Sequence, residues 1–513
     1  MPRLPQDTVL AAIDVGTNAV KLELARPLPD GSLESLHQER DPVRPGEGVF
    51  KTGRIPREVC DRLLAALRRY GALCRRYKAR VRAVATSAVR EAKNKDEIIQ
   101  RARKEAGLNL EIVSGREEAR LICLGVLHGK PPDARSLCID IGGGSTEVAT
   151  AVGERPVNLW SISLGAVRLA EVFGVNGRVG ARELQLMRDH AREAVAASLP
   201  GFILGAPRRA LGSSGNVKAV VSFAAAEGTA HATARQISRA VEDLVAMGAQ
   251  ERRRLFDSRR ADIIVPGAVI LEALARHLKL ESVTAVDRGL RDGILVELMR
   301  RRSPRASDRW LVEAAQELGR RWRHDEAHAR QVARLSLELF DQLEEVHGLP
   351  DSARPLLEVA ALLHDVGNVV SYQKHHRHTY YLITNADIPG LADRERELVA
   401  QIARYHRRNL PDLGHPALEG LTRPEAVMVR KLAMLVRLGD ALDRSHLQPV
   451  RAVRAQVTAA GVALAVEGRG PVDLELWDVQ PELPRFRDVF RRRLTVAAAP
   501  PRGRSRSRSR ARA

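Results

Sequence analysis

The chain has 513 residues, of which 44% are hydrophobic, enough for about three domains with sizeable cores. Its net charge of +20 predicts polyanionic partners: nucleic acid, polyphosphate or highly phosphorylated nucleotides. Aromatic residues make up only 4%, which argues against the stacking platforms of a protein that binds single-stranded nucleic acid. No specific nucleic-acid partner is therefore expected.

The sequence predicts a cytoplasmic protein without a membrane anchor. No apolar run approaches the ~20 residues that span a bilayer, and residues 1–7 lack the basic-then-apolar order of a secretory signal. The four cysteines, Cys60, Cys74, Cys123 and Cys138, show no CxxC pairing and lie within apolar or helical patterns. This usage is typical of reduced thiols.

The first predicted elements are a strand over residues 8–13, a strand over 19–25 and a third over 33–39. Between the first two lies Asp14-Val15-Gly16-Thr17-Asn18-Ala19, an aspartate followed by a glycine turn. Apolar residues at helical spacing predict a helix over 56–77, and a further strand is expected over 81–85.

Two candidate catalytic residues follow. Arg90 comes just after the strand end, beside the hydroxyls of Thr86 and Ser87, where its bidentate fork suits a phosphoryl group. The alternative is an ordinary exposed arginine. After a helix over 95–106 and a strand over 108–113, Ser114 is predicted to cap a helix that carries Glu118 in its first turn. Glu118 is either a general base or a surface carboxylate that favours the helix dipole.

A second glycine turn is predicted in Asp140-Ile141-Gly142-Gly143-Gly144-Ser145-Thr146-Glu147, between two apolar strands. Three glycines let backbone N–H groups converge on a phosphate. Asp140 and Glu147 flank the turn, and carboxylates beside an anion suggest a bridging Mg²⁺. The alternative is a glycine-rich hairpin with incidental acids. Aligned on the aspartates, this turn repeats the one at Asp14, which predicts two similar lobes facing one cleft and a shared metal.

The rest of the second lobe is predicted as strands over 148–151 and 157–162, helices over 167–173, 181–198, 216–225, 234–247 and 267–278, a strand over 283–286 and a closing helix over 290–299. Residues 300–308 read as a basic linker. A helical region follows, then strands over 450–476 and a basic helix over 484–493. The domains are thus expected at 1–130, 131–302 and 303–498, with a disordered Arg/Ser tail at 499–513.

The helical region carries a histidine series of its own. His328 lies on one helix, His364-Asp365 follows an apolar helix, and Asp440 comes much later. These ligand types suit a divalent metal. The series resembles the HD metal-dependent phosphohydrolase module, which implies a second divalent metal site. The alternative is an inherited helical scaffold whose histidines serve packing or polyanion contact.

In order and spacing, six motifs resemble the exopolyphosphatase / guanosine pentaphosphate phosphohydrolase (Ppx/GppA) family. They lie at residues 14–18, 86–92, 114–121, 140–147, 163–169 and 212–216. The resemblance implies an α/β fold of two actin-like (ribonuclease H-like) lobes around a cleft, followed by an all-helical HD-like domain with a few C-terminal strands. We also expect a homodimer.

The resemblance also implies roles for single residues. Glu118 would be the catalytic base, Arg90 would grip the terminal phosphoryl group, and Asp14, Asp140 and Glu147 would organise Mg²⁺ or Mn²⁺. The phosphate cradle would consist of Thr17, Asn18, Gly143, Gly144 and Ser145. One departure is Ala19, where the family usually has serine.

The chain is therefore expected to be a Mg²⁺-dependent exopolyphosphatase that releases terminal phosphate by direct attack of water. An alternative is hydrolysis of guanosine pentaphosphate (pppGpp), the same step on a smaller substrate, with ppGpp as product. An alternative of another class is a non-catalytic sensor of polyphosphate or alarmone, although such a protein has no use for a general base.

Overall fold

The computed structural model describes residues 8–175, 179–201, 207–226, 229–300, 304–408, 410–411, 415–458 and 460–499. The chain forms two compact units, residues 1–307 and 308–513. The expected tail beyond residue 499 and residues 301–303 of the expected linker lie outside the described residues. Among the described residues, no helix combines the length and apolarity needed to cross a bilayer.

The first unit opens with a five-stranded sheet in the order β3-β2-β1-β4-β5. Its strands are β1 (Leu10–Val15), β2 (Val20–Pro27), β3 (Leu33–Asp41), β4 (Arg80–Ala85) and β5 (Leu110–Ile112). Strand β1 pairs antiparallel with β2 and parallel with β4. Because β1 is central, all of its residues are buried. Ile13 and Val15 face one core and Leu10 and Ala12 face another.

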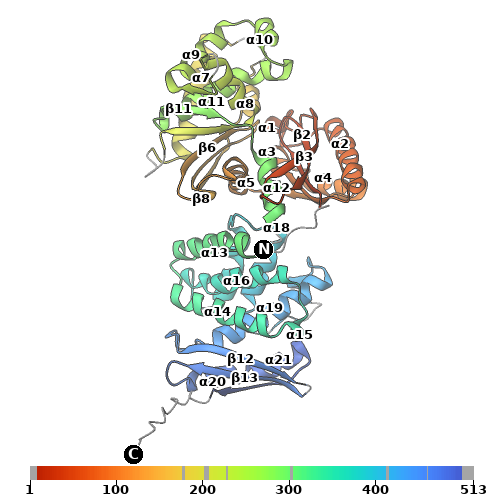
Figure 1. Ribbon diagram of the computed structural model, residues 1–513, viewed down its shortest axis with the longest axis vertical. Helices are drawn as coiled ribbons and strands as arrows, with labels where there is room; N and C mark the ends of the chain where they lie inside the picture. Colours follow the sequence, from red (N-terminus) through yellow and green to blue (C-terminus); the bar gives the residue numbers. More distant parts are fainter. Residues whose placement is uncertain are drawn as a thin grey trace, which may run out of the picture. The chain divides into compact units, whose positions relative to one another are not determined.

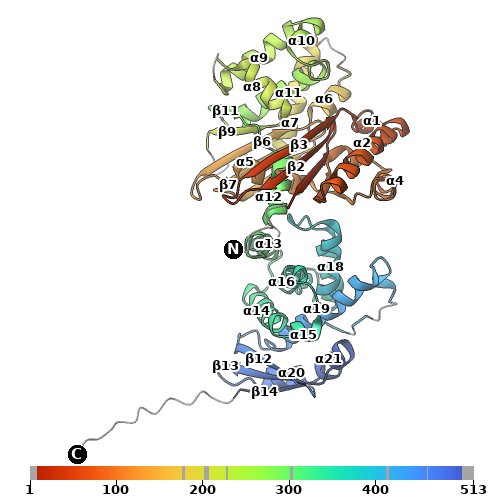
Figure 2. The ribbon, with the colours of Figure 1, turned by 45° about the vertical axis from the view of Figure 1, so that its right-hand side comes forward.

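Helix α2 (Arg57–Arg76) covers the first of these faces and α12 (Leu290–Arg300) covers the second, as Figure 2 shows. The remaining helices of this lobe are α1 (Val49–Thr52), α3 (Ser87–Glu91), α4 (Lys95–Arg101), a π-helical turn (Ala102–Ala106) and α5 (Gly115–Leu127). Helix α5 also packs against β7 (Thr146–Val152) and β8 (Arg155–Ile162) of the second sheet, so it lies between the two sheets (Figure 1).

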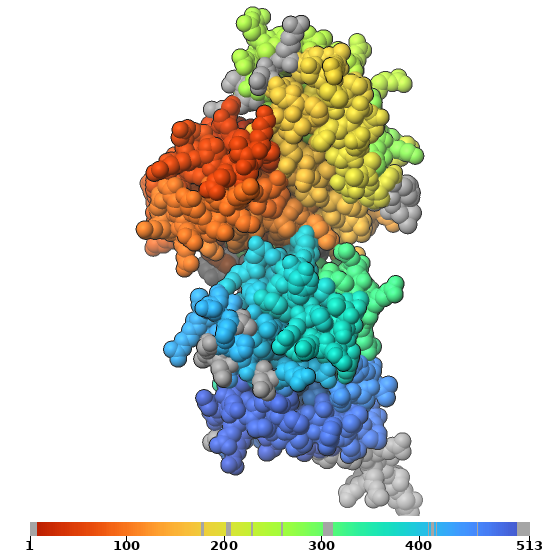
Figure 3. All heavy atoms as spheres, turned by 180° about the vertical axis from the view of Figure 1, so that it is seen from behind, coloured from red at the N-terminus to blue at the C-terminus, as the bar shows by residue number. Residues whose placement is uncertain are grey.

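The second sheet has the order β10-β11-β9-β6-β7-β8 and repeats the arrangement of the first. Strand β6 (Arg135–Ile141) occupies the place of β1, antiparallel to β7 and parallel to β9 (Arg209–Ser213). The edge strands are β8 and β10 (His231–Thr233), and β11 (Ser282–Ala285) lies between β10 and β9. Its helices are α6 (Ala166–Val172), α7 (Ala181–Ser198), α8 (Ser214–Ala224), α9 (Ala234–Ala246), α10 (Ala249–Leu255) and α11 (Ser258–His277). Two actin-like lobes are therefore confirmed, and Figure 3 shows their surfaces adjoining in red-orange and yellow.

Helix α12 corrects one prediction. It was expected to close the second lobe, but it packs against β1 and α5 in the core formed with Leu10, Val84 and Leu121. The crossing of α5 and α12 is close because of a glycine. A Cβ on Gly293 would lie 1.8 Å from the carbonyl oxygen of Leu121, so no other residue fits without displacing a helix.

The second unit is a helical layer over a small sheet. Its helices are α13 (Pro304–Arg321, which crosses the division between units), α14 (Glu326–Gln342), α15 (Glu344–His347), α16 (Arg354–Leu363), α17 (His375–Asn385), α18 (Asp393–Arg404) and α19 (Arg423–Ala441). Short 3-10 turns lie at Asp351–Ala353, Val366–Val369 and Pro416–Leu418. The sheet, in the order β12-β13-β14, contains β12 (Val450–Thr458), β13 (Gly461–Gly468) and β14 (Leu494–Ala498).

Three sequence expectations change in this unit. The expected linker over 300–308 is helical from Pro304 onward. The expected run of strands over 450–476 ends in helix α20 (Asp473–Val479). The expected basic helix over 484–493 is α21 (Glu482–Phe490), followed by the unexpected strand β14.

Candidate active site

The two glycine turns have the same hydrogen-bonded geometry. In the first, the Gly16 N–H donates to the Ala19 carbonyl oxygen at 3.1 Å, and in the second the Gly142 N–H donates to the Ser145 carbonyl oxygen at 2.9 Å. The registers also match, since Asp14 lies opposite Lys21 and Asp140 lies opposite Glu147. The repeat read from the sequence is therefore a repeat in three dimensions, with lysine and glutamate at equivalent places.

The two turns meet across the junction of the lobes. A Cβ on Gly143 would lie 2.7 Å from the Thr17 Cβ, so a side chain at position 143 would force the turns apart. Thr17 Oγ1 is hydrogen-bonded to Ser87 Oγ at 2.9 Å. The carbonyl oxygen of Gly144 accepts a hydrogen bond from Arg168 Nε at 2.7 Å.

A cavity of about 530 Å³ opens beside the meeting turns. Seven of the predicted site residues line it: Asp14, Thr17, Asn18, Glu118, Asp140, Gly143 and Ser145. Three others, Arg90, Gly144 and Glu147, do not line it. The cavity thus gathers predicted residues from both lobes, and the last three lie outside its lining.

Glu118 is positioned by the start of helix α5. The Ser114 hydroxyl accepts the Glu117 N–H at 3.1 Å, which is the predicted N-cap. Arg90 lies against the carboxylate it was expected to assist. Its Nη1 donates to Glu118 Oε2 at 3.2 Å and to the Val113 carbonyl oxygen at 2.8 Å. This contact orients Glu118, and a phosphate contact of Arg90 remains a prediction.

Burial raises the pKa of Glu118 to about 7, against the opposing effect of Arg90 and with the help of Asp14 and Asp140. A carboxylate with a pKa close to neutrality can accept a proton from water more readily than a normal glutamate. Its position and protonation behaviour therefore both suit a general base.

Glu117, the neighbour of Glu118, belongs to a buried ion network. Its two carboxylate oxygens accept hydrogen bonds from Arg120 Nε and Nη2, both at 2.7 Å. Arg120 and Arg82 also pair with Glu297 on α12. This buried ion network joins β4, α5 and α12, and includes Glu117, the residue before Glu118. From the sequence alone, charged residues such as these would be assigned to the surface of the protein.

The remaining carboxylates fit a divalent cation. Asp14 Oδ1 and Glu147 Oε2 are buried and have no hydrogen-bond partner in the part of the chain that the structure describes. Burial raises the pKa of Asp140 to about 6, and burial with the nearby Glu118 and Asp140 carboxylates raises the pKa of Glu147 well above its usual range. Carboxylates that repel one another this way are stabilised by a shared hard cation such as Mg²⁺.

Sequence reasoning did not single out the basic wall of the cavity. Six cationic side chains line it: Lys21, Arg40, Lys218, Arg260, Arg288 and Arg291. They come from both lobes, from the turn before α12 (Arg288) and from the first turn of α12 (Arg291). Among these six, only Lys21 could have been identified from the sequence, because the repeat places it opposite Asp14. In the structure its Nζ lies 3.5 Å from Asp14 Oδ2.

Comparison with known proteins agrees with this geometry. The profile of the Ppx/GppA phosphatase family matches residues 28–302, more than half of the chain. The chain belongs to the Ppx/GppA phosphatase family. The profile of Ppx/GppA phosphatase domain III matches residues 312–468. The chain is accordingly a hydrolase acting on phosphoanhydride bonds.

Curated relatives and solved structures share this membership. The guanosine-5'-triphosphate,3'-diphosphate pyrophosphatase of Vibrio vulnificus is 28% identical over 85% of this chain and 88% of its own, and that of Photobacterium profundum is 28% identical over 88% and 90%. An exopolyphosphatase from Cytophaga hutchinsonii is 26% identical with a TM-score of 0.51, covering 57% of this chain and 98% of its own. The Aquifex aeolicus family member is 25% identical with a TM-score of 0.50 over the same shares.

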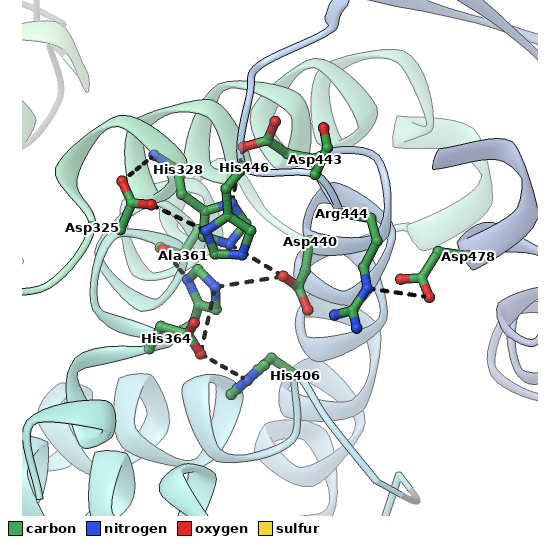
Figure 4. A network of polar contacts seen from close by, with 12 residues as sticks. Asp325, His328, Ala361, His364, His406, Asp440, Asp443, Arg444, His446 and Asp478 are labelled. Carbon is green, nitrogen blue, oxygen red and sulfur yellow. Dashed lines mark hydrogen bonds and ion pairs between the residues drawn. The ribbon is translucent and has the colours of Figure 1, made fainter. Parts of the chain in front are cut away.

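Domain III of this Ppx/GppA protein brings the predicted His/Asp set together. His328 Nε2 lies 3.3 Å and His364 Nε2 lies 3.8 Å from Asp440 Oδ1, and His364 Nε2 lies 3.9 Å from Asp365 Oδ1. Figure 4 shows His328, His364 and Asp440 pointing toward one another from three helical segments. His375 and His406, which the metal set expected from the sequence does not include, lie beside it. Their Nε2 atoms lie 3.1 and 3.3 Å from Asp365 Oδ1.

Proposed function

We propose that the first unit is an exopolyphosphatase, a Mg²⁺-dependent enzyme that releases the terminal phosphate of inorganic polyphosphate. The observation that carries this proposal is the lining of the cavity. Six cationic side chains and several hydroxyls line it, and none of the described lining residues is aromatic. Such a wall suits a chain of phosphates, and its described lining offers no aromatic ring on which a purine base could stack.

The proposed mechanism is direct attack by water. Glu118 orients the water and accepts its proton, because it lies on the cavity wall and its pKa is raised toward neutrality. Arg90 holds the Glu118 carboxylate in position. The backbone of the turns at Thr17 and Gly143 cradles the phosphoryl oxygens, while the basic wall holds the remaining chain.

Asp14, Asp140 and Glu147 are the residues that would hold Mg²⁺, which when bound neutralises charge on the phosphoryl group. Their unpartnered buried oxygens support this assignment.

A second candidate is hydrolysis of pppGpp. The two curated relatives named as guanosine-5'-triphosphate,3'-diphosphate pyrophosphatases support it, since they match over most of both chains. The bond cleaved is of the same kind, so the catalytic residues would be unchanged. The third alternative, a sensor without activity, leaves the raised pKa of Glu118 without a use.

The test is phosphate release by the purified chain from long polyphosphate and from pppGpp, each with Mg²⁺ and with a chelator. We expect faster release from polyphosphate, and only with Mg²⁺. Faster turnover of pppGpp would replace the first candidate by the second. Binding of either compound without any turnover would support the sensor.

A further inference from the structure

Tyrosine is concentrated in one stretch of the second unit. The chain contains six tyrosines, and four of them lie between residues 372 and 405: Tyr372, Tyr380, Tyr381 and Tyr405. Two of the four are exposed, Tyr372 at 68% and Tyr381 at 66%. Val369 and Val370, just before Tyr372, are 51% and 56% exposed. Large apolar side chains that are exposed together on one segment mark an interaction site.

The same segment carries positive charge and no negative charge. Residues 366–386 include Lys374, Arg377 and three histidines but neither aspartate nor glutamate. Lys374 and Arg377 are exposed, and neither forms an ion pair with any residue that the structure describes. The acid directly before the segment, Asp365, is paired with two of the histidines of this unit. The exposed cations are therefore available to an anionic partner.

Two further arginines lie against this segment. Arg407 and Arg408 follow helix α18, and the guanidinium carbon of Arg407 lies 5.8 Å from the centre of the Tyr372 ring. Burial lowers the pKa of His376 to about 4, together with charged neighbours that include Arg377 and Arg408. Arg377 and Arg408 therefore both lie near His376, although they belong to different segments of the chain. The cations of the two segments form one surface.

Each exposed tyrosine of this surface has an arginine beside it. Arg407 lies next to Tyr372. Arg377 is the neighbour of Tyr381 on helix α17, because side chains four residues apart on a helix lie on the same face. An aromatic ring can stack on any nucleobase, and an arginine can bind the phosphate beside that base. Rings paired with cations therefore suit a strand that presents a base with every phosphate.

Other polyanions and other partners fit this surface less well. Inorganic polyphosphate would satisfy the arginines, but it has no planar group that could stack on the tyrosines. A second copy of this chain would bring its own net charge of +20 to a surface that is already positive. In a nucleic-acid duplex the faces of the bases are covered by one another, so that rings on a protein surface do not reach them. A single strand meets both requirements.

We propose that the surface formed by Tyr372, Lys374, Arg377, Tyr381, Arg407 and Arg408 binds single-stranded nucleic acid without preference for base sequence. The proposal concerns the second unit and does not rest on the function proposed for the first. The aromatic content of the whole chain, 4%, gives no sign of this surface, because the tyrosines are gathered in one place.

Binding of two matched strands tests the contribution of the bases. The full chain is titrated, in chelator, into a fluorescently labelled oligouridylate of about 12 nucleotides, and binding is followed by anisotropy. The comparison strand has the same sugar–phosphate backbone without bases. We expect the oligouridylate to bind at least ~10-fold more tightly than the abasic strand, because two of its bases stack on tyrosines. Equal affinity for the two strands would overturn the proposal and leave only contact with a polyanion.

Substitution of the rings assigns this difference to the surface. Tyr372→Ala and Tyr381→Ala should each weaken binding of the oligouridylate at least ~5-fold and leave binding of the abasic strand unchanged. Tyr372→Phe and Tyr381→Phe keep the ring and should bind both strands as the wild type does. The matched control is Trp477→Ala, because this ring is 69% exposed but lies on the acidic helix α20. An equal loss in the control, or no loss in either alanine variant, would overturn the assignment.

Substitution of a cation should have the opposite pattern. Arg377→Gln should weaken binding of the oligouridylate and of the abasic strand alike, because it removes a phosphate contact. The slope of the logarithm of the binding constant against the logarithm of salt concentration should fall by about 0.7. An unchanged slope would show that Arg377 does not contact the strand and would contradict the position given to it.

Discussion

The Glu118 carboxylate should destabilise the metal-free protein at neutral and alkaline pH. Burial raises its pKa from 4.5 to about 7, so the folded chain holds this proton more tightly than the unfolded chain does. The stability contributed by the protonated group is complete below about pH 4.5. It is lost as the pH rises to about 7 and stays constant above that.

The magnitude follows from the size of the shift. A difference of about 2.5 pKa units corresponds to about 3 kcal/mol at pH 8. Glu118→Gln keeps the shape and an acceptor for Arg90 but carries no charge. The variant should therefore be about 3 kcal/mol more stable than the wild type at pH 8 without divalent metal, which for a unit of this size raises Tm by about 5 °C. At pH 4.5 the variant and the wild type should have the same Tm.

The assay is thermal unfolding in chelator between pH 4.5 and 8, repeated with Mg²⁺. Mg²⁺ should raise the Tm of the wild type more than that of the variant. The cation relieves repulsion between carboxylates, and the variant lacks part of that repulsion. The same variant should lose phosphate release by about 10²–10⁴-fold while still binding polyphosphate. Equal melting temperatures of the wild type and the variant at pH 8 in chelator would show that burial does not disfavour the charged Glu118 carboxylate, and would refute this reasoning.

Further predictions concern packing, metal and domain architecture. Glu297→Gln should lower the free energy of unfolding of the first unit, measured in urea, by about 3 kcal/mol, because Arg82 and Arg120 lose a buried carboxylate. Gly143→Ala should sharply reduce turnover, since its Cβ would clash with Thr17. Mg²⁺ should raise Tm more at pH 8 than at pH 5, because the raised pKa values in the cleft leave fewer charges at low pH. A chain ending at residue 302 should lose more activity on long polyphosphate than on short.

The two substitutions have matched controls. Glu281, whose side chain is 52% exposed, makes only exposed ion pairs, with Arg208 and Arg209, both at 3.7 Å, so Glu281→Gln should be nearly neutral in the same urea assay. Gly248→Ala meets no atom within 4 Å and should leave turnover unchanged. Equal destabilisation by the two glutamate variants, or equal activity of the two glycine variants, would contradict the packing argument. Equal loss on long and short polyphosphate would contradict the prediction for the shortened chain.

Elements with a strong local signal were predictable from the sequence. Three glycines between carboxylates predicted the turn at residue 143, and the N-cap at Ser114 was confirmed. Helix α7 has the predicted bounds because its apolar spacing is regular. By contrast, β9 is a five-residue strand that contains Gly212, so neither length nor composition marks it.

Long-range partners were not predictable for a different reason. Helix α12 is apolar on most sides, and its hydrophobic pattern does not indicate which sheet the helix packs against. His375 and His406 lie on segments whose sequences carry no ligand spacing, and only the folded chain brings both within 3.3 Å of Asp365. The pairing of Arg82 with Glu297 joins positions 215 residues apart.

That last pairing bears on how the protein is made. The sheet of the first lobe leaves the ribosome early, but the helix that seals one of its faces is the last element of the unit to be synthesised. Until then Leu10 and Ala12 lack the helix that covers them, and Arg82 has Glu111 and Glu117 but not its third acidic partner, Glu297. Folding of the two lobes is therefore coupled. Neither lobe can complete its folding, or be deleted from the chain, without affecting the other.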